Sequence, residues 1–227
     1  MEFPKINFLR YKIMNLLSRQ NLGYTDRVKF NVDTLEIGHH KVKYKGIPLI
    51  KCPFDYVIMQ MIIFEVKPDL IIEIGTNRGG SALYFADLLN TIGKGEIHTI
   101  DVQDIVFAEV KDHPRIKFFN DGYEGYNLEH SKVFENILVV EDASHMYEDV
   151  KETINKFKSL VKKDSYFIVE DGILDKLGWK NKYNGGPNKA IKEFIKEDDS
   201  FIIDRKWCDM FGVNATFNTN GYLKKIK

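Results

Sequence analysis

Residues 70–81 read LIIEIGTNRGGS, and this stretch decides the fold. The run LIIEIG at 70–75 is short, rich in β-branched residues and ends in glycine, which is typical of a buried parallel strand. Gly79, Gly80 and Ser81 then open a helical pattern, SALYFADLLN. Because a strand that turns through glycines into a helix is half of a βαβ unit, the sequence predicts an α/β protein.

The same alternation of strand and helix continues to the end of the chain. Helical patterns cover 56–66, 147–161 and 187–197, among others, and strands are predicted near 96–101, 116–120, 136–141, 166–170, 201–204 and 221–226. Seven strands without an eighth unit favour an open sheet over a barrel. The predicted fold is therefore a Rossmann-like, mostly parallel, seven-stranded doubly wound sheet.

The residues before this pattern form a different unit. Ile6, Leu9, Ile13, Leu16 and Leu17 share one helical face, which predicts a helix packed on its own domain or on a second subunit; an anionic membrane surface is the alternative. Residues 28–50 are predicted to form short strands, with period-two alternation in KVKYK at 41–45. We expect 1–50, this helix and a small β extension, to serve oligomerisation or acceptor selection, and 51–227 to be the main domain.

Composition excludes several classes of protein. The 227 residues carry 33 basic and 33 acidic side chains, and this balance argues against a nucleic-acid-coating protein. No apolar run is long enough to predict a transmembrane segment. Two cysteines cannot form a disulfide framework, so a reducing, cytoplasmic setting is expected. The first 51 residues nevertheless hold ten basic and four acidic side chains.

Acidic residues end each of the first five predicted strands. In open α/β sheets, ligands bind outside the carboxyl ends of the strands. Carboxylates gathered on that rim need a cation, ribose hydroxyls or a cationic ligand to offset their repulsion. The strand ends are Glu73-Ile-Gly75, Asp101, Asp121-Gly122, Glu141-Asp142 and Glu170-Asp171.

The first glycine-rich loop points to one class of cofactor. It is neither G-x-G-x-x-G nor a P-loop, which disfavours dinucleotides and nucleoside triphosphates. Glu73 suits a positively charged ligand, and Asp101 is placed to accept hydrogen bonds from ribose hydroxyls. A ribose without a phosphate string, joined to an amino acid, describes S-adenosylmethionine. The predicted cofactor-binding residues are Glu73, Gly75, Thr76, Asn77, Gly79, Gly80, Ser81, Asp101, Asp121, Gly122 and Asp142.

Asp142, Glu170 and Asp171 are predicted to hold a divalent cation such as Mg²⁺, which prefers oxygen ligands. The alternative is a polar strand end with Asp142 capping a helix near Met146. His145 is a candidate general base or metal ligand, or else an ordinary residue at the start of a helix.

Three other segments allow two interpretations each. The pair His39-His40 follows a glycine and is interpreted as a turn in preference to a metal site. The stretch 184–187, NGGP, near Trp179 and Tyr183, is either a lid or a simple connection. The stretch 51–55, KCPFD, either folds over the cofactor or is a turn between elements.

Taken together, these residues resemble the cephalosporin hydroxylase family, which belongs to the S-adenosylmethionine-dependent methyltransferase superfamily. The resemblance covers roughly residues 45–225, whereas 1–44 match nothing. It implies a class I methyltransferase fold, a homo-oligomer, Asp121 and Gly122 near the adenine, and Asp142, Glu170 and Asp171 as Mg²⁺ ligands. Its motifs are Lys51-x-Pro53-Phe54-Asp55, Gln60, Lys67-Pro68-Asp69, Glu73-Ile-Gly75-Thr76, Gly79-Gly80-Ser81-Ala82, Asp101, Asp142-x-x-His145, Val169-Glu170-Asp171, Gly186-Pro187, Ala190, Phe194 and Gly221-Tyr222-Leu223.

The expected activity is metal-assisted methyl transfer from S-adenosylmethionine to a hydroxyl of a small acceptor. A vicinal diol would chelate the cation, which suggests a sugar or another polyhydroxylated or phosphorylated molecule of cell-surface polysaccharide or natural-product biosynthesis. Asp142 would hold the cation and His145 would take the proton. The basic first 51 residues could attract an anionic acceptor.

Three alternatives stay open. The acceptor atom could be nitrogen or a phosphate oxygen. The chain could be a non-catalytic cofactor-binding protein. It could also be a non-haem iron hydroxylase, which needs two histidines and a carboxylate, but only His145 is expected near the acidic strand ends.

Overall fold

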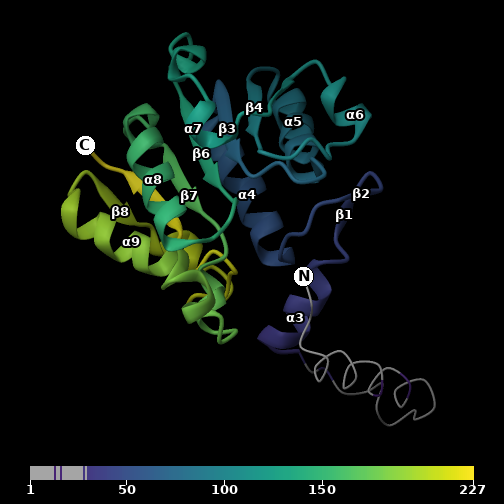
Figure 1. Ribbon diagram of the computed structural model, residues 1–227, viewed down its shortest axis with the longest axis vertical. Coiled ribbons are helices and arrows are strands. Elements are labelled where there is room, and N and C mark those ends of the chain that lie inside the picture. Colours follow the sequence, from purple (N-terminus) through teal and green to yellow (C-terminus); the bar gives the residue numbers. More distant parts are fainter. Residues whose placement is uncertain (1–12, 14–15, 17–27, 29) are drawn as a thin grey trace.

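The computed structural model describes Ile13, Leu16, Val28 and residues 30–227. Its centre is a seven-stranded sheet with the order β5-β4-β3-β6-β7-β9-β8 (Figure 1). The first five strands of this order are parallel, and β9 is antiparallel to both neighbours. The predicted doubly wound sheet is therefore confirmed. The strands are β3 (Leu70–Ile74), β4 (Glu96–Ile100), β5 (Ile116–Phe119), β6 (Ile137–Glu141), β7 (Tyr166–Val169), β8 (Phe201–Ile203) and β9 (Tyr222–Lys225).

Strand β3 lies at the topological switch point, where the strand order reverses. It pairs with β4 on one side and β6 on the other, so that Leu70 lies opposite Glu96 and Ile137. All five residues of β3 and of β6 are buried, as their continuous apolar runs predict. The carboxyl ends of β3 and β6 therefore flank the crevice where doubly wound sheets bind ligands.

Helices cover both faces of the sheet, with α4 and α5 on one side and α8 and α9 on the other (Figure 1). Ile71 and Leu138 pack in the core under α4 and α5. Ile72 and Val139, the next residues along the same strands, pack in the core under α8 and α9. The helices are α4 (Pro53–Val66), α5 (Gly80–Ile92), α6 (Ala108–Lys111), α7 (Gly122–Gly125), α8 (Tyr147–Phe157), α9 (Gly186–Glu197) and α10 (Arg205–Cys208), and the 3-10 turns are η1 (Leu128–Ser131), η2 (Lys158–Leu160), η3 (Gly172–Asp175) and η4 (Lys180–Tyr183).

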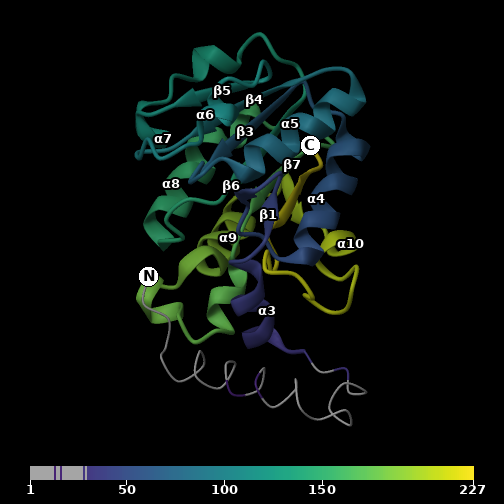
Figure 2. The same ribbon diagram turned by 90° about the vertical axis from the view of Figure 1, so that its right-hand side faces the viewer.

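The segment 28–50 was predicted as strands, and this is wrong for its first half. A helix, α3 (Val32–His39), stands there, beyond one end of the sheet (Figure 2). The Asn31 side chain accepts a hydrogen bond from Thr34 N at 3.0 Å, and Thr34 Oγ1 accepts one from Asn31 N at 2.9 Å. This reciprocal cap starts the helix although it is short and holds a glycine. The strand prediction holds for the hairpin of β1 (Lys43–Tyr44) and β2 (Ile47–Pro48).

The hairpin is part of the main core, because Ile47 and Leu49 pack with residues of α4 and α5. Of the predicted N-terminal stripe, Ile13 and Leu16 are helical and 48% and 65% exposed. Ile6, Leu9 and Leu17 lie outside the described residues, and the division at residue 50 stays a prediction. Among the described residues, no helix combines the length and hydropathy needed to span a bilayer.

Candidate active site

A cavity of about 620 Å³ lies at the carboxyl ends of the central strands and extends to α3. This volume is within the usual range of small-molecule sites. Glu73, Gly79, Asp121 and Glu170 are not among its lining residues. Of the residues predicted from the sequence, it is lined by Gly75, Thr76, Asn77, Gly80, Ser81, Asp101, Gly122, Asp142, His145 and Asp171.

Two glycines of the first loop permit close backbone packing. Gly75 has a φ of +103°, and a Cβ there would lie 2.1 Å from the carbonyl oxygen of Asp142. A Cβ on Gly80 would lie 2.3 Å from the carbonyl oxygen of Pro48. The loop is thus fitted between the end of β6 and the hairpin, and only glycine suits these positions.

Asp101 is held in a fixed orientation at the end of β4. Its Oδ2 accepts a hydrogen bond from Asn77 N at 2.8 Å, and its Oδ1 accepts one from Gln103 N at 2.9 Å. Each carboxylate oxygen has a second lone pair, so both can still accept from the hydroxyls of a ligand.

Glu73 lies behind the loop. It is 1% exposed, and its Oε2 accepts a hydrogen bond from Thr99 Oγ1 at 2.6 Å. Burial raises its pKa. The Glu73 side chain therefore supports the loop from inside. That it contacts the cofactor stays a prediction.

Asp142, His145 and Asp171 converge at the ends of β6 and β7, and we call them the acidic centre. One ligand atom from each residue lies within 4.8 Å of those of the other two. His145 Nε2 is 3.3 Å from Asp171 Oδ2, while His145 Nδ1 is buried without a hydrogen-bond partner among the described residues. His145 and Asp171 have φ values of +60° and +58°, a strained conformation for such residues.

The surroundings shift the titration of the acidic centre. Burial, together with the charge of Glu170, raises the pKa of Asp171 to about 7, and burial raises that of Asp142 well above its usual value. Burial lowers the pKa of His145 to about 4, so this imidazole is neutral at pH 7. Half-buried carboxylates beside a neutral imidazole form a donor set that a divalent cation would stabilise.

The capping alternative for Asp142 finds no support. Helix α8 has Met146 as its N-cap, without a side-chain cap hydrogen bond. Met146 N donates instead to Ser144 Oγ at 3.1 Å.

Glu170, the third predicted metal ligand, is paired with a lysine. Lys51 Nζ is buried, donates to both carboxylate oxygens of Glu170, and lies 3.8 Å from Asp142 Oδ2. Burial and Asp142 raise the pKa of Glu170 to about 8. Sequence reasoning noted Lys51 only as part of the 51–55 stretch and missed this contact, because no local pattern links residues 119 positions apart.

The stretch 51–55 is more than a connecting turn. Asp55 is buried in the first turn of α4, where it accepts hydrogen bonds from Phe217 N at 2.9 Å and Tyr222 Oη at 3.0 Å. It thereby fixes α4 to the C-terminal part of the sheet and positions Lys51. Further along the chain, Trp179 and Tyr183 line the cavity, whereas residues 184–187 do not, so both interpretations of that stretch stay open.

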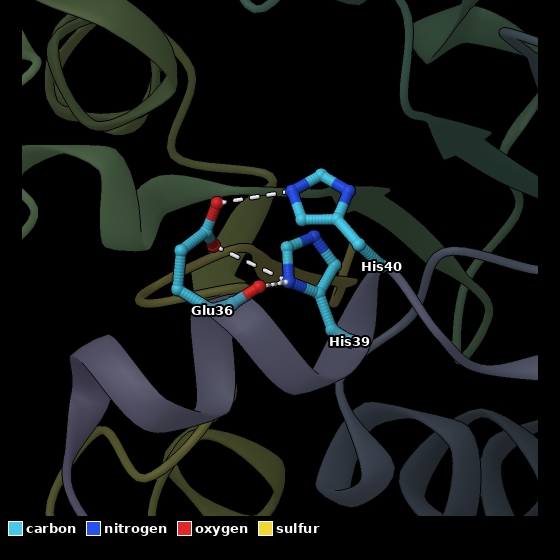
Figure 3. Close-up of side chains that lie close together, drawn as sticks. All are labelled: Glu36, His39 and His40. Atoms are coloured by element: carbon cyan, nitrogen blue, oxygen red, sulfur yellow. Dashed lines mark hydrogen bonds and ion pairs between the residues drawn. The ribbon is translucent and has the colours of Figure 1, made fainter. Parts of the chain in front are cut away.

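Helix α3, which the sequence analysis did not predict, supplies part of the cavity wall. Glu36, His39 and His40 all line the cavity, and the Glu36 charge contributes to the raised pKa of Asp171. The expectation that His39 and His40 lie away from the acidic strand ends is therefore wrong. The prediction failed because α3 was not foreseen. The end of this helix brings Glu36, His39 and His40 together beside the cavity (Figure 3).

Comparisons with known proteins agree on one group. The family model described as Rhamnosyl O-methyltransferase/CmcI matches residues 38–226. A rhamnosyl O-methyltransferase of Mycobacterium leprae is 27% identical over 190 residues, covering 79% of this chain and 81% of that protein. One from Mycobacterium tuberculosis is 27% identical over 184 residues, with 73% and 70% covered.

Solved structures agree on the fold. A structure of CmcI with SAH has a TM-score of 0.64 at 16% identity and covers 91% of this chain and 92% of its own. One of CmcI with Mg and SAM has a TM-score of 0.61 at 18% identity, with 91% and 85% covered. The class I methyltransferase fold expected from the sequence is confirmed.

Proposed function

The chain belongs to the Rhamnosyl O-methyltransferase/CmcI family and is an S-adenosylmethionine-dependent O-methyltransferase, and on this premise we propose that it methylates a hydroxyl of a sugar. The observation that carries the proposal is the cavity that joins the glycine loop and Asp101 to the acidic centre. A methyl donor and an acceptor hydroxyl can meet in such a space.

The cofactor half of the cavity suits S-adenosylmethionine. The fixed carboxylate of Asp101 can accept from two ribose hydroxyls, and Gly75 and Gly80 let the loop pack closely enough on β6 and the hairpin to line the cavity with its backbone. The described lining includes six carboxylates and no lysine or arginine, which favours a sulfonium over a phosphate-bearing cofactor.

The acidic centre fits a divalent cation such as Mg²⁺. When bound, that cation would lower the pKa of the acceptor hydroxyl and orient it. Asp142 and Asp171 would hold it, with His145 or Glu170 as the third ligand. Because Glu170 is paired with Lys51, the structure favours His145 as the third ligand. The sequence predicts Glu170 in that role, and this stays a prediction.

His145 has a second possible role. Its neutral imidazole, kept so by burial, can take the proton that the acceptor hydroxyl loses. Its contact with Asp171 Oδ2 orients the ring for this transfer.

The acceptor that this lining favours is an uncharged polyol. Because the described wall carries acidic side chains and no lysine or arginine, its side chains favour an uncharged acceptor over a phosphate. An anionic acceptor stays a hypothesis that depends on the basic excess of the first 51 residues, whose Lys41, Lys43 and Lys45 are described and do not line the cavity. The relatives' name, rhamnosyl O-methyltransferase, supports a deoxyhexose. A role in polysaccharide or natural-product biosynthesis, the cytoplasmic location and the homo-oligomer likewise stay predictions.

The test is a methyl-transfer assay with S-adenosylmethionine, Mg²⁺ and a panel of acceptors. The panel contains a rhamnoside, a hexose glycoside without a free vicinal diol, a sugar phosphate and an amine, and products are identified by mass spectrometry. We expect transfer to the vicinal diol and its loss with EDTA. Transfer to the amine alone, or full turnover in EDTA, would contradict the proposed function.

A further inference from the structure

We propose that Glu36 and His39 of α3, with His40 at the C-cap of this helix, form a second cation site, which takes a transition-metal ion such as Zn²⁺, Co²⁺ or Mn²⁺. Figure 3 shows the carboxylate of Glu36 beside the two imidazoles at the end of the helix. One ligand atom from each residue lies within 4.8 Å of those of the other two, so a single ion can contact all three after small side-chain movements.

The hydrogen bonds of the cluster prepare one imidazole for metal binding. His39 Nδ1 lies 2.6 Å from the backbone oxygen of Glu36. A carbonyl oxygen can only accept, so Nδ1 carries the proton and Nε2 keeps its lone pair. Metal-bound histidines are held in this way, with the other ring nitrogen donating to a carbonyl or a carboxylate. Packing against Phe217, with ring centroids 5.1 Å apart, fixes the ring.

The other two ligands are oriented and reachable from the cavity. Glu36 Oε1 lies 3.2 Å from His40 Nε2, and Glu36 Oε2 lies 3.3 Å from His39 Nδ1. The side chains of His39 and Glu36 are 7% and 12% exposed, whereas that of His40 is 24% exposed. An ion there would be held on the protein side and open towards the cavity.

The donor set distinguishes this site from the acidic centre. Two imidazole nitrogens and one carboxylate suit Zn²⁺, Co²⁺ or Mn²⁺ better than Mg²⁺, which prefers oxygen ligands. Two of its ligands come from α3 and the third, His40, is the C-cap of that helix, whereas the acidic centre is built from the loops after β6 and β7. The two sites line the same cavity, whose described lining has six carboxylates and no lysine or arginine; Lys51, behind the lining, lies 3.8 Å from Asp142 Oδ2.

This arrangement gives the second ion a role in binding the acceptor. An ion on α3 would bind an acceptor oxygen away from the hydroxyl that is methylated. That role rests on the proposed function, whereas binding of the ion itself does not.

The test titrates the full-length protein with Co²⁺ in the presence of Mg²⁺, by calorimetry and by the visible absorption of nitrogen-bound Co²⁺. We expect Glu36→Gln and His40→Ala each to weaken one binding event at least tenfold and to change its spectrum. His130→Ala, an exposed histidine outside the cavity lining, is the control and should leave both unchanged. Asp171→Asn should leave this event in place, which separates it from the acidic centre.

Two results would overturn the proposal. One is Co²⁺ binding by Glu36→Gln and His40→Ala with the affinity and spectrum of the unchanged protein. The other is that the unchanged protein shows no Co²⁺-binding event beyond that of the acidic centre while both variants raise the acceptor KM, which would make the cluster a direct acceptor contact. Failure of methyl transfer with Co²⁺ binding intact would count against the proposed function and leave the site standing.

Discussion

Two requirements apply to residue Asp171: its side chain supplies a carboxylate to the acidic centre, and its backbone adopts the left-handed conformation. Asparagine tolerates that conformation, so Asp171→Asn removes the charge without adding strain. We expect kcat to fall about 100-fold, because one ligand of the predicted cation is lost, while S-adenosylmethionine binding stays within about threefold. Activity assays and calorimetry measure the two effects.

Asp164 provides a matched control for this variant. It too has a positive φ, of +68°, but it precedes β7 at the opposite end of the sheet and its side chain is 69% exposed. Asp164→Asn should leave kcat unchanged. Equal losses in both variants would trace the effect to backbone strain and contradict a role of Asp171 in the acidic centre.

Lys51 is the buried cation beside the predicted metal ligands. Lys51→Met keeps the unbranched apolar part of the side chain but leaves Glu170 buried without its partner. We expect a loss of about 3 kcal/mol in the free energy of unfolding, measured by urea denaturation, because breaking one side of a buried pair leaves the Glu170 carboxyl group without its hydrogen-bond donor. Lys206→Met is the control, since its pair with Glu65 is exposed and should contribute less than about 1 kcal/mol. Similar losses in both variants would refute this account of Lys51.

At the scale of elements, the loop between β3 and α5 depends on the missing side chain of Gly75. Gly75→Ala places a methyl group on the backbone of Asp142 in addition to straining a φ of +103°. We expect a loss of more than about 3 kcal/mol in stability and weakened cofactor binding.

Gly93→Ala separates strain from steric conflict. Gly93 ends α5 with a φ of +86° and has open space where a Cβ would stand. Strain alone should lower the free energy of unfolding by about 1 kcal/mol. If Gly75→Ala lowered the free energy of unfolding no more than Gly93→Ala does, the close packing of the loop on β6 would not contribute to stability.

The elements also show what a sequence can and cannot predict. Strands β3 and β6 were predictable because burial on both faces leaves an unbroken apolar run. Helix α3 was missed because its signal is a cap, Asn31 with Thr34, and not an apolar stripe. Its position against the cavity was beyond reach of sequence patterns, since it depends on tertiary packing.

The candidate site divides in the same way. Strand ends are local features, so Asp101, Asp142 and Asp171 could be assigned to one rim from their positions alone. Side-chain direction is not local: Glu73 turns into the interior, and Glu170 turns to Lys51. Whether these two contact cofactor or metal in the loaded enzyme stays a prediction.

At the scale of the whole molecule, the zero net charge conceals a separation of charges. Carboxylates gather around the cavity, while the described lysines and arginines lie elsewhere on the molecule or, as with Lys51, behind the lining. A cationic cofactor and divalent ions would offset this charge, so ligand binding should stabilise the fold as well as enable the chemistry.

The pH dependence of global stability should reveal one buried group remote from the cavity. His98 in β4 is 1% exposed, its Nδ1 lies 2.6 Å from Tyr126 Oη, and burial lowers its pKa to about 4. Lys117 and His130 oppose its protonation and Glu96 favours it.

Because the unfolded chain binds a proton near pH 6.5 and the folded chain only near pH 4, His98 should cost stability as the pH falls between these values. We expect a loss of about 2 kcal/mol from pH 7 to pH 5. His98→Asn, whose amide can replace Nδ1 at Tyr126, does not titrate. Urea denaturation of both proteins at the two pH values should therefore show a smaller loss for the variant, and equal losses would assign the acid sensitivity to other groups.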